Sequence, residues 1–263
     1  MRRPAAVLCD LDGTVWDDDA VLPGVPEAIA RLRAAGIRIR FVTNITRLPA
    51  HVLGGRLAAA GIPAPVEDVQ TAPVAAAHWL RHGGIERVAL YVADGTREDF
   101  SGFTLDDAAP EAVVVGDLGS AWNFERLNRA FLQVMGGARL VALQRNRYWL
   151  TGGALALDAG AFVAALEYAT GCEAMVVGKP SRAFFETAVR AVGCPPADVV
   201  CVGDDVANDI AGAKAVGCRG VLVRTGKYRP GDETTVDARP DALVDSVADL
   251  PGLFGIEVRG AMP

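Results

Sequence analysis

A short apolar strand that ends in two aspartates is the feature that most constrains the fold of this chain. Residues 6–9 are Ala-Val-Leu-Cys, and the segment Asp10-Leu11-Asp12-Gly13-Thr14 follows. A continuous apolar run is typical of a strand buried on both faces of a parallel sheet, and ligands gather outside the carboxyl ends of such strands. Asp10 and Asp12 can therefore approach one point from a turn that Gly13 makes sterically easy. Two carboxylates at one point need a cation or a shared proton between them, and the hard cation Mg²⁺ is the simplest partner.

Two other structures could explain this acidic segment. An EF-hand loop also spaces aspartates two apart, but it requires Gly at its sixth position and Glu at its twelfth, where this chain has Val15 and Val21. The EF-hand is therefore excluded. An acidic turn without chemistry remains open at this point, because Asp and Gly are ordinary turn residues.

Composition limits the class of protein and its partners. The 263 residues are 51% hydrophobic and 22% charged, as in a globular protein, and the apolar runs are shorter than a membrane span. No signal peptide precedes the first strand, so we expect a cytoplasmic location and no membrane partner. The net charge of -6 argues against a nucleic-acid partner. The five cysteines include no CxxC pair, so neither a disulfide framework nor a zinc site is expected.

The two ends of the chain share one pattern of strands and helices. Residues 26–35 have apolar positions at helical spacing, which predicts a helix. We expect the chain to pass from the acidic turn straight into this helix. A β-branched strand at 37–42 follows it. Near the C-terminus a helix at 182–192, a strand at 199–202, a helix at 209–216 and a strand at 221–223 repeat the order. Together these elements predict one parallel sheet with right-handed crossovers.

The long middle segment predicts an inserted domain. Thr43 and Lys179 are much farther apart in sequence than the dozen or so residues that a crossover needs. Strands at 87–92, 112–115 and 140–143 alternate with helices at 124–135 and 161–170. We therefore expect a core formed by residues 1–83 and 174–263 and a smaller α/β domain at 84–173. Its strands end near Asp94, Asp117 and Asn146, which either line a wall facing the main site or are ordinary turn residues.

Four polar clusters at strand ends of the predicted core match the needs of phosphoryl transfer. This reaction requires a nucleophile, a cation over the phosphoryl oxygens and donors that hold those oxygens. Asp10 is the expected nucleophile, forming an aspartyl-phosphate, and Asp12 is the expected general acid and base. Asp204 would complete the metal shell, whereas Thr43, Asn44 and Lys179 would hold phosphoryl oxygens.

Each cluster also has a purely structural explanation. Thr43 and Asn44 could form a turn or a helix cap, and Lys179 could be a solvated lysine before a helix. Asp204, Asp205 and Asp209 could cap the next helix, where acids favour the positive end of the helix dipole. Capping and metal binding are compatible, so these alternatives remain open.

The order of the motifs resembles that of the haloacid dehalogenase superfamily. The matching segments are Asp10-Leu11-Asp12-Gly13-Thr14, Phe41-Val42-Thr43-Asn44, Gly178-Lys179-Pro180 and Gly203-Asp204-Asp205-Val206-Ala207-Asn208-Asp209. The resemblance implies a Mg²⁺-dependent phosphatase with Asp10 as nucleophile and metal ligand. It also implies that Asp12 acts as acid/base and binds the metal through its backbone carbonyl, that Asp204 is a side-chain ligand, and that Gly13, Asp205 and Asp209 support the site.

The inserted segment resembles the α/β cap of the class IIA phosphatases in this superfamily, on a core with a Rossmann-like parallel sheet. Three segments, beginning at Arg147, Val176 and Val223, are similar to the phospholysine phosphohistidine inorganic pyrophosphate phosphatases and their hydrolase-domain relatives. This implies a small phosphorylated substrate, such as pyrophosphate or a phosphoramidate, with Arg147 and Tyr148 contributing to specificity, and it is compatible with a homodimer formed through the cap. Sugar, glycerol or nucleotide monophosphates remain the alternative substrates. Relatives acting on glycerol phosphate and nucleotides have a longer Asn-Asn run where this chain has Asn44-Ile45-Thr46, so their substrates do not carry over.

Other functions explain fewer residues. A dehalogenase would not need Asp12, and a phosphomutase usually carries a smaller cap directly after the first motif. A dinucleotide-binding module would need GxGxxG after the first strand, which this chain lacks. A binding or regulatory protein that has lost catalysis on the same fold is the remaining alternative from another class.

Overall fold

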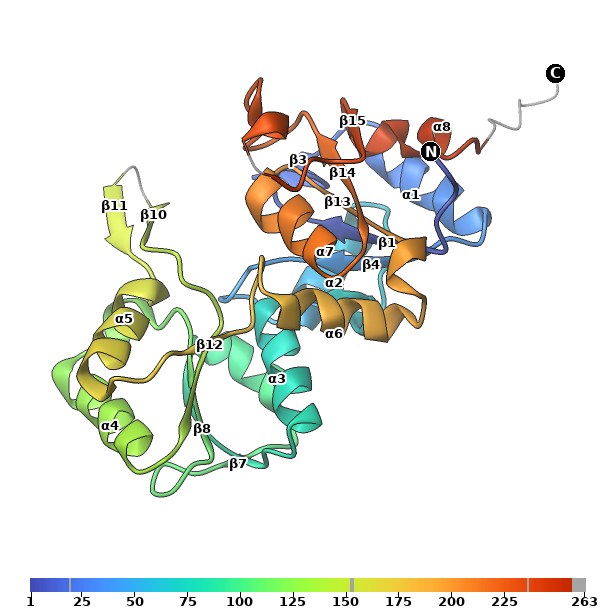
Figure 1. Cartoon of the computed structure of the whole chain (residues 1–263). Helices are drawn as coiled ribbons and strands as arrows, with labels where there is room; N and C mark the ends of the chain where they lie inside the picture. Colours follow the sequence, from blue (N-terminus) through green and yellow to red (C-terminus); the bar gives the residue numbers. More distant parts are fainter. Residues whose placement is uncertain (19, 152–153, 236, 257–263) are drawn as a thin grey trace, which may run out of the picture. The chain divides into compact units, whose positions relative to one another are not determined.

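The computed structural model describes residues 1–18, 20–151, 154–235 and 237–256, and the chain divides into two units (Figure 1). The first, called the core unit, contains Met1–Thr43, Leu53–Gln70 and Phe185–Pro263. The second, called the cap unit, contains Asn44–Val52 and Thr71–Phe184. Each unit contains its own parallel sheet, and each is described by itself.

The core sheet has six parallel strands in the order β15-β14-β13-β1-β4-β5. Leu8 in β1 is paired with Cys201 on one side and with Arg40 on the other, and every residue of β1 is buried. From β1 the chain adds β4 and β5 in one direction, and later β13, β14 and β15 in the other. The order therefore reverses between β1 and β13, and ligands of open α/β sheets bind at such a switch point. The strands are β1 (Ala6–Asp10), β4 (Arg38–Val42), β5 (Val69–Gln70), β13 (Val199–Gly203), β14 (Arg219–Val223) and β15 (Ala242–Val244).

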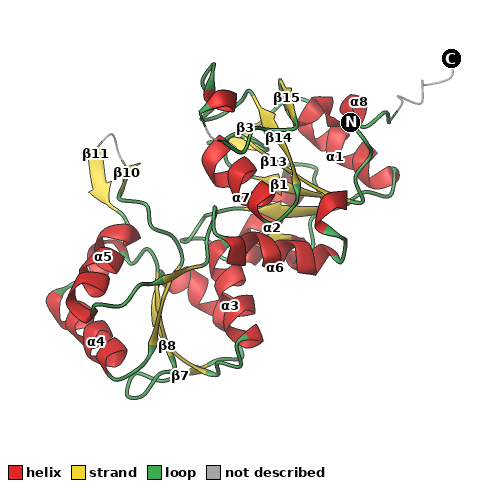
Figure 2. Cartoon of the chain, in the orientation of Figure 1, coloured by secondary structure: helices red, strands yellow, loops and turns green. Residues whose placement is uncertain are grey.

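Helices follow the strands of the core sheet, as the sequence pattern predicts (Figure 2). Helix α1 carries Pro26 in its first turn and buries an apolar stripe that includes Ile29 and Leu32. The helices in or entering this unit are α1 (Val25–Ala34), α2 (Ala50–Ala59), α6 (Arg182–Val192), α7 (Gly212–Ala215) and α8 (Leu250–Leu253), with a π-helix, η5 (Val206–Ala211), before α7. Short 3-10 turns are η1 (Val66–Asp68), η4 (Pro196–Asp198), η6 (Asp232–Thr234) and η7 (Val247–Asp249).

A two-stranded hairpin separates the acidic turn from α1. Strands β2 (Trp16–Asp17) and β3 (Ala20–Val21) are antiparallel, with Trp16 opposite Val21. The expectation that the chain passes straight into a helix was therefore wrong. Strands of two residues are too short to produce a readable alternation of apolar and polar positions.

The cap unit has a five-stranded parallel sheet in the order β12-β9-β8-β6-β7. Successive residues of a strand face opposite sides, so Val114 packs with α3, whereas Val113 and Val115 pack with α4 and α5 (Figure 2). Its elements are α3 (Ala72–His82), β6 (Arg87–Tyr91), η2 (Asp94–Phe100), β7 (Thr104–Leu105), β8 (Ala112–Val115), η3 (Gly119–Ala121), α4 (Phe124–Met135), β9 (Arg139–Ala142), α5 (Ala159–Thr170) and β12 (Met175–Val176), with the antiparallel pair β10 (Tyr148–Thr151) and β11 (Ala154–Leu157).

The predicted fold class, an α/β core with a Rossmann-like parallel sheet and an inserted smaller α/β unit, is confirmed. The two units divide the chain at other positions than the expected borders of 84 and 173. Helix α3 lies in the cap unit because its apolar face, including Ala76 and Leu80, packs with Val88 and Val114 of the cap sheet. The five cysteines are free, and none of the described helices has the length and hydropathy needed to cross a membrane.

Candidate active site

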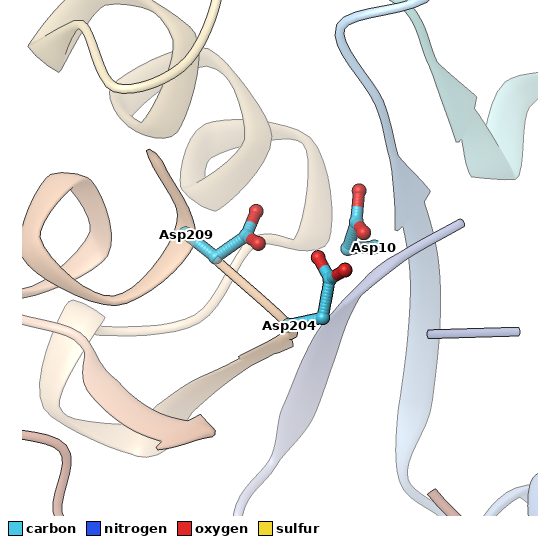
Figure 3. Close-up of side chains that lie close together, drawn as sticks. All are labelled: Asp10, Asp204 and Asp209. Carbon is cyan, nitrogen blue, oxygen red and sulfur yellow. The ribbon is translucent and has the colours of Figure 1, made fainter. Parts of the chain in front are cut away.

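Three buried carboxylates converge at the switch point of the core sheet. Asp10 is the last residue of β1, Asp204 follows β13, and Asp209 lies in the π-helix η5. One oxygen from each lies within 4.8 Å of the others (Figure 3). The three residues are 5%, 2% and 1% exposed. Burying three carboxylates together is very costly unless protons or a cation neutralise them, and hard divalent cations bind oxygen ligands of this kind.

Two glycines allow the chain to approach the carboxylate of Asp204. Gly13 and Gly226 have φ angles of +77° and +56°, which favour glycine. A Cβ at either position would lie 2.1 Å from Asp204 Oδ2. Any side chain at these positions would therefore displace the carboxylate.

The loop after β14 also holds Asp204 in place. The backbone N–H of Lys227 donates a hydrogen bond to Asp204 Oδ2 at 2.6 Å. The Thr225 hydroxyl donates to the backbone carbonyl of Gly13, which connects the same loop to the turn after β1. Because these donors come from another part of the chain, the position of Asp204 depends on the tertiary fold.

The other two acids of the cluster have partners of their own. The Thr14 hydroxyl donates to Asp10 Oδ2 at 3.1 Å, and the backbone N–H of Asp205 donates to Asp209 Oδ2 at 3.2 Å. Hydrogen bonds of this kind fix the orientation of a carboxylate.

Asp12 lies outside the cluster of buried acids. Its side chain is exposed, and its Oδ1 accepts a hydrogen bond from Trp16 Nε1 at 2.8 Å. A carboxylate in this position can exchange protons with solvent or with a bound molecule.

Asp205 caps the π-helix η5. Its Oδ1 accepts the backbone N–H groups of Ala207 and Asn208, and its Oδ2 accepts the Asn208 amide. Burial raises the pKa of Asp205, but the hydrogen bonds from Asn208 and Ala207 and the charge of Lys227 outweigh it, so the pKa lies below its ordinary value. The capping alternative therefore accounts for Asp205, whereas Asp204 and Asp209 lie in the acid cluster.

The predicted phosphate-holding residues fall in both units. Thr43 is buried in the core unit after β4, and its backbone N–H donates to the carbonyl of Gln70 at 2.9 Å. Asn44 and Lys179 lie in the cap unit, where two hydrogen bonds join them. Asn44 Nδ2 donates to the Lys179 carbonyl at 2.9 Å, and the Lys179 N–H donates to Asn44 Oδ1 at 2.7 Å. The second and third motifs are thus joined directly although they are distant in sequence.

The cap unit has a pocket at the carboxyl ends of its strands. The pocket measures about 450 Å³, and its lining includes Arg47, Asp94, Asp117 and Arg126. Arg47 donates from Nε and Nη2 to the buried carboxylate of Asp117, and this hydrogen-bonded contact raises the pKa of Arg47. Asp94 is exposed and is not part of any ion pair within the described residues. Asp94 and Asp117, two of the three strand-end residues that could form a wall of the inserted domain, line this pocket.

The expected specificity residues Arg147 and Tyr148 are exposed at the start of β10, outside the residues that line this pocket.

Sequence reasoning missed Arg47, Trp16 and the backbone of Lys227. Arg47 follows the Thr43-Asn44 motif by a few residues, which was an available signal. Trp16 gave none, because an isolated aromatic residue usually belongs to a core.

Known protein families and relatives match most of the length of this chain. Residues 7–105 match the family model described as haloacid dehalogenase-like hydrolase, and residues 176–250 match the model described as HAD-hydrolase-like. Haloacid dehalogenase-like hydrolase domain-containing protein 2 of Homo sapiens is 42% identical over 245 residues, which are 93% of each chain.

A second relative and a solved structure complete the comparison. The phospholysine phosphohistidine inorganic pyrophosphate phosphatase of Mus musculus is 36% identical over 254 residues, covering 94% of this chain and 93% of the relative. The structure of the glycerol phosphate phosphatase Rv1692 from Mycobacterium tuberculosis, in complex with magnesium, superposes with a TM-score of 0.82 and 29% identity, covering 94% of this chain and 76% of the other.

Proposed function

This chain belongs to the haloacid dehalogenase-like hydrolase family, and from that premise we propose that it is a Mg²⁺-dependent phosphatase of small phosphorylated molecules. The observation that carries the proposal is the cluster of Asp10, Asp204 and Asp209 at the switch point of the core sheet, with Asp12 two residues from Asp10. A nucleophilic carboxylate, a cation site and a separate acid/base within a few residues are what phosphoryl transfer requires.

The carboxylate set fits a divalent cation. Asp10 and Asp204, with the backbone carbonyl of Asp12, would hold Mg²⁺, and Asp209 would support it. Bound there, Mg²⁺ would offset the negative charge of the transferring phosphoryl group. Buried aspartates with oxygens within 4.8 Å of one another support this assignment because hard divalent cations bind converging carboxylate oxygens.

The proposed reaction has two displacements at phosphorus. A carboxylate oxygen of Asp10 attacks phosphorus and forms a new P–O bond, while the bond to the leaving group breaks and Asp12 gives a proton to the departing atom. Water then attacks the aspartyl-phosphate, Asp12 accepts a proton from that water, and the bond between Asp10 and phosphorus breaks. Inorganic phosphate leaves, and both carboxylates return to their starting forms.

Thr43, Asn44 and Lys179 are the proposed donors to the phosphoryl oxygens. The two hydrogen bonds between Asn44 and Lys179 support this assignment, because they orient the second and third motifs together. A hydroxyl, an amide and an ammonium can each donate a hydrogen bond to an oxygen of a phosphoryl group.

The cap pocket is the proposed recognition site of the cap unit for a small polar molecule. Arg47 lies three residues after Asn44, so the two Cα atoms are at most about 11 Å apart. Arginine and aspartate side chains of opposite charge line the pocket, which favours a small polar molecule over a large apolar one. Pyrophosphate and phosphoramidates are the first candidates, after the relative that is named for them. Sugar, glycerol or nucleotide monophosphates are the second, since a structural relative is a glycerol phosphate phosphatase.

A turnover assay tests the proposed function and separates it from a catalytically silent binding protein. Phosphate release from p-nitrophenyl phosphate should require Mg²⁺ and stop on chelation. A panel of phosphoramidates, pyrophosphate and small phosphate esters would then rank the substrates by kcat/KM. Binding of these compounds without turnover in Mg²⁺ would favour the silent protein.

A homodimer formed through the cap is a further part of this proposal. Phe124 and Met135 on α4 and Tyr168 on α5 are large apolar side chains that are 81%, 59% and 93% exposed. Exposed apolar side chains on neighbouring helices are common at interfaces between subunits. Analytical ultracentrifugation should give the mass of two chains, and Phe124→Glu should reduce it to that of one.

A further inference from the structure

We propose that Trp16 is a positioning residue for Asp12, whose carboxylate it holds through the indole N–H. This inference rests on the proposed function, because it takes Asp12 as the acid/base. Trp16 Nε1 lies 2.8 Å from Asp12 Oδ1. The contact occupies one carboxylate oxygen and assigns the other to proton transfer.

The turn after β1 brings Trp16 back to Asp12. The carbonyl of Leu11 accepts the N–H groups of Thr14, Val15 and Trp16, and the N–H of Gly13 donates to the Trp16 carbonyl at 2.7 Å. Trp16 then pairs with Val21 in the β2–β3 hairpin. The backbone of this tight turn is thus fixed on both sides of the side-chain contact.

The indole ring is held more firmly than the carboxylate that it contacts. Trp16 is 2% exposed, and the guanidinium of Arg56, from α2, lies over its ring at 5.0 Å from the centroid. Asp12 is exposed. A buried, stacked ring has little rotational freedom, so it acts as the fixed partner that limits the positions of an exposed carboxylate.

An indole suits this task chemically. Its N–H is a donor only, so it neither accepts the proton that Asp12 carries nor replaces it. Asp12 must give a proton in the first displacement and accept one in the second. A partner that cannot exchange protons keeps Oδ1 engaged in both steps, and the proton moves through Oδ2.

The alternative is that Trp16 only stabilises the hairpin. The two roles differ in their dependence on the leaving group. An alkoxide is a poor leaving group that needs a proton from Asp12, whereas nitrophenolate leaves without one. Loss of the N–H should therefore lower kcat/KM selectively for an alkyl phosphate, because kcat/KM reports the first displacement and not the hydrolysis of the aspartyl-phosphate that both substrates share. Loss of hairpin stability should lower kcat/KM for both substrates alike.

The first test is Trp16→Phe, which keeps an aromatic ring under Arg56 and removes the N–H. We expect kcat/KM for an alkyl phosphate such as glycerol phosphate to fall about tenfold or more, and kcat/KM for p-nitrophenyl phosphate to fall less than about threefold, because only the alkyl leaving group needs the proton in the first displacement. Val21→Ala is the matched control: it weakens packing of the hairpin and keeps the indole, and its two rates should fall together or not at all.

Two further measurements keep the proposal falsifiable if Trp16→Phe folds poorly. Replacing the indole at position 16 by the isosteric benzothiophene, through a benzothienylalanine, removes only the N–H and should show the same selective loss. In the Asp12→Ala background, Trp16→Phe should cause no further loss of alkyl phosphate hydrolysis. Full activity of the benzothiophene protein, or an additive loss in the double variant, would overturn the positioning role while leaving the proposed function intact. If Asp12→Ala alone hydrolyses alkyl phosphates normally, the acid/base assignment itself fails, and the role of Trp16 fails with it.

Discussion

The two parallel sheets of this molecule use their strand ends differently. In the core unit, the ends of β1 and β13 bring together buried carboxylates that have like charge. In the cap unit, the ends of β6 and β8 carry Asp94 and Asp117, and the second of these is paired with Arg47. Converging carboxylate oxygens are ligands that a hard divalent cation prefers, whereas arginine and aspartate side chains around an open pocket suit recognition of a small polar molecule. The two parallel sheets differ in strand order, and the proposed function gives their strand ends different tasks.

The largest expected difference between the two units comes from neutralising one carboxylate in each. Asp10→Asn should reduce phosphate release by about a thousandfold or more, because it removes the nucleophile. Its melting temperature should stay close to that of the wild type without Mg²⁺, since Asn is nearly isosteric with Asp and its side-chain oxygen can still accept the hydrogen bond from Thr14. Asp117→Asn, the matched change in the cap, should keep turnover of p-nitrophenyl phosphate within tenfold. Comparable losses in both variants would erase the distinction between the two units.

The Mg²⁺ requirement should also distinguish variants of the core unit from variants of the cap unit. Mg²⁺ at a hundredfold excess over its Kd should stabilise the wild type by about 2.7 kcal/mol, measured by thermal unfolding. Asp204→Ala should need far more Mg²⁺ for both stabilisation and turnover. Ca²⁺ should inhibit phosphate release by the wild type, because its larger and looser coordination misplaces Asp10. Arg47→Met, in the cap, should leave the Mg²⁺ requirement unchanged. Full activity in a chelator would refute the cation site.

Preference among small substrates with similar leaving groups should respond to variants in the cap unit. Arg147→Ala and Tyr148→Ala, together with Arg47→Met at the pocket, should change relative kcat/KM among small substrates by about tenfold, the usual effect of losing one polar contact. Hydrolysis of p-nitrophenyl phosphate should change less, since its leaving group needs little recognition. Equal losses across the panel would assign these residues a structural role. A change for Arg47 alone would place recognition at the pocket and not at β10.

The smallest expected effect is on stability and concerns a carboxylate of the cap unit. Asp99 Oδ1 accepts the backbone N–H of Ala50 at 3.3 Å, and its Oδ2 is buried without a hydrogen-bond partner among the described residues. Burial raises the pKa of Asp99 to about 6, against the lowering effect of Ala50, while the nearby charges of Glu98 and His51 act in opposite directions. The folded protein therefore binds this proton more tightly than the unfolded chain. The resulting stability is complete below about pH 4 and is lost as the pH rises through about 6.

Asp99→Asn removes that penalty. Because Asp99 is partly exposed, solvent screening reduces this gain in stability. The variant should be more stable than the wild type by about 1 kcal/mol at pH 8 and equal to it at pH 4. Urea unfolding at both pH values measures the difference, with Glu98→Gln as the neighbouring control. A gain that is independent of pH would contradict the explanation from burial.

Sequence alone could predict the elements with strong periodicity and the residues at their ends. Helices α4 and α6 and strand β8 have the expected bounds, and Asp10 and Asp204 meet because β1 and β13 are adjacent and parallel. The hairpin β2–β3 is too short to leave a pattern. The hydrogen bond from the backbone of Lys227 to Asp204 could not be predicted either, because a backbone donor has no residue signature and its position depends on the tertiary fold.

Direct trapping of a phosphorylated Asp10 tests the central claim most directly. The wild type would be mixed with a small phosphorylated substrate and Mg²⁺, quenched in acid within milliseconds and reduced with borohydride, which converts an aspartyl-phosphate to homoserine. Peptide mass spectrometry should then find homoserine at position 10 and not at 12, 204 or 209, with none in Asp10→Asn. Turnover of the same substrate with no modification at Asp10, or with modification at another aspartate, would contradict the account.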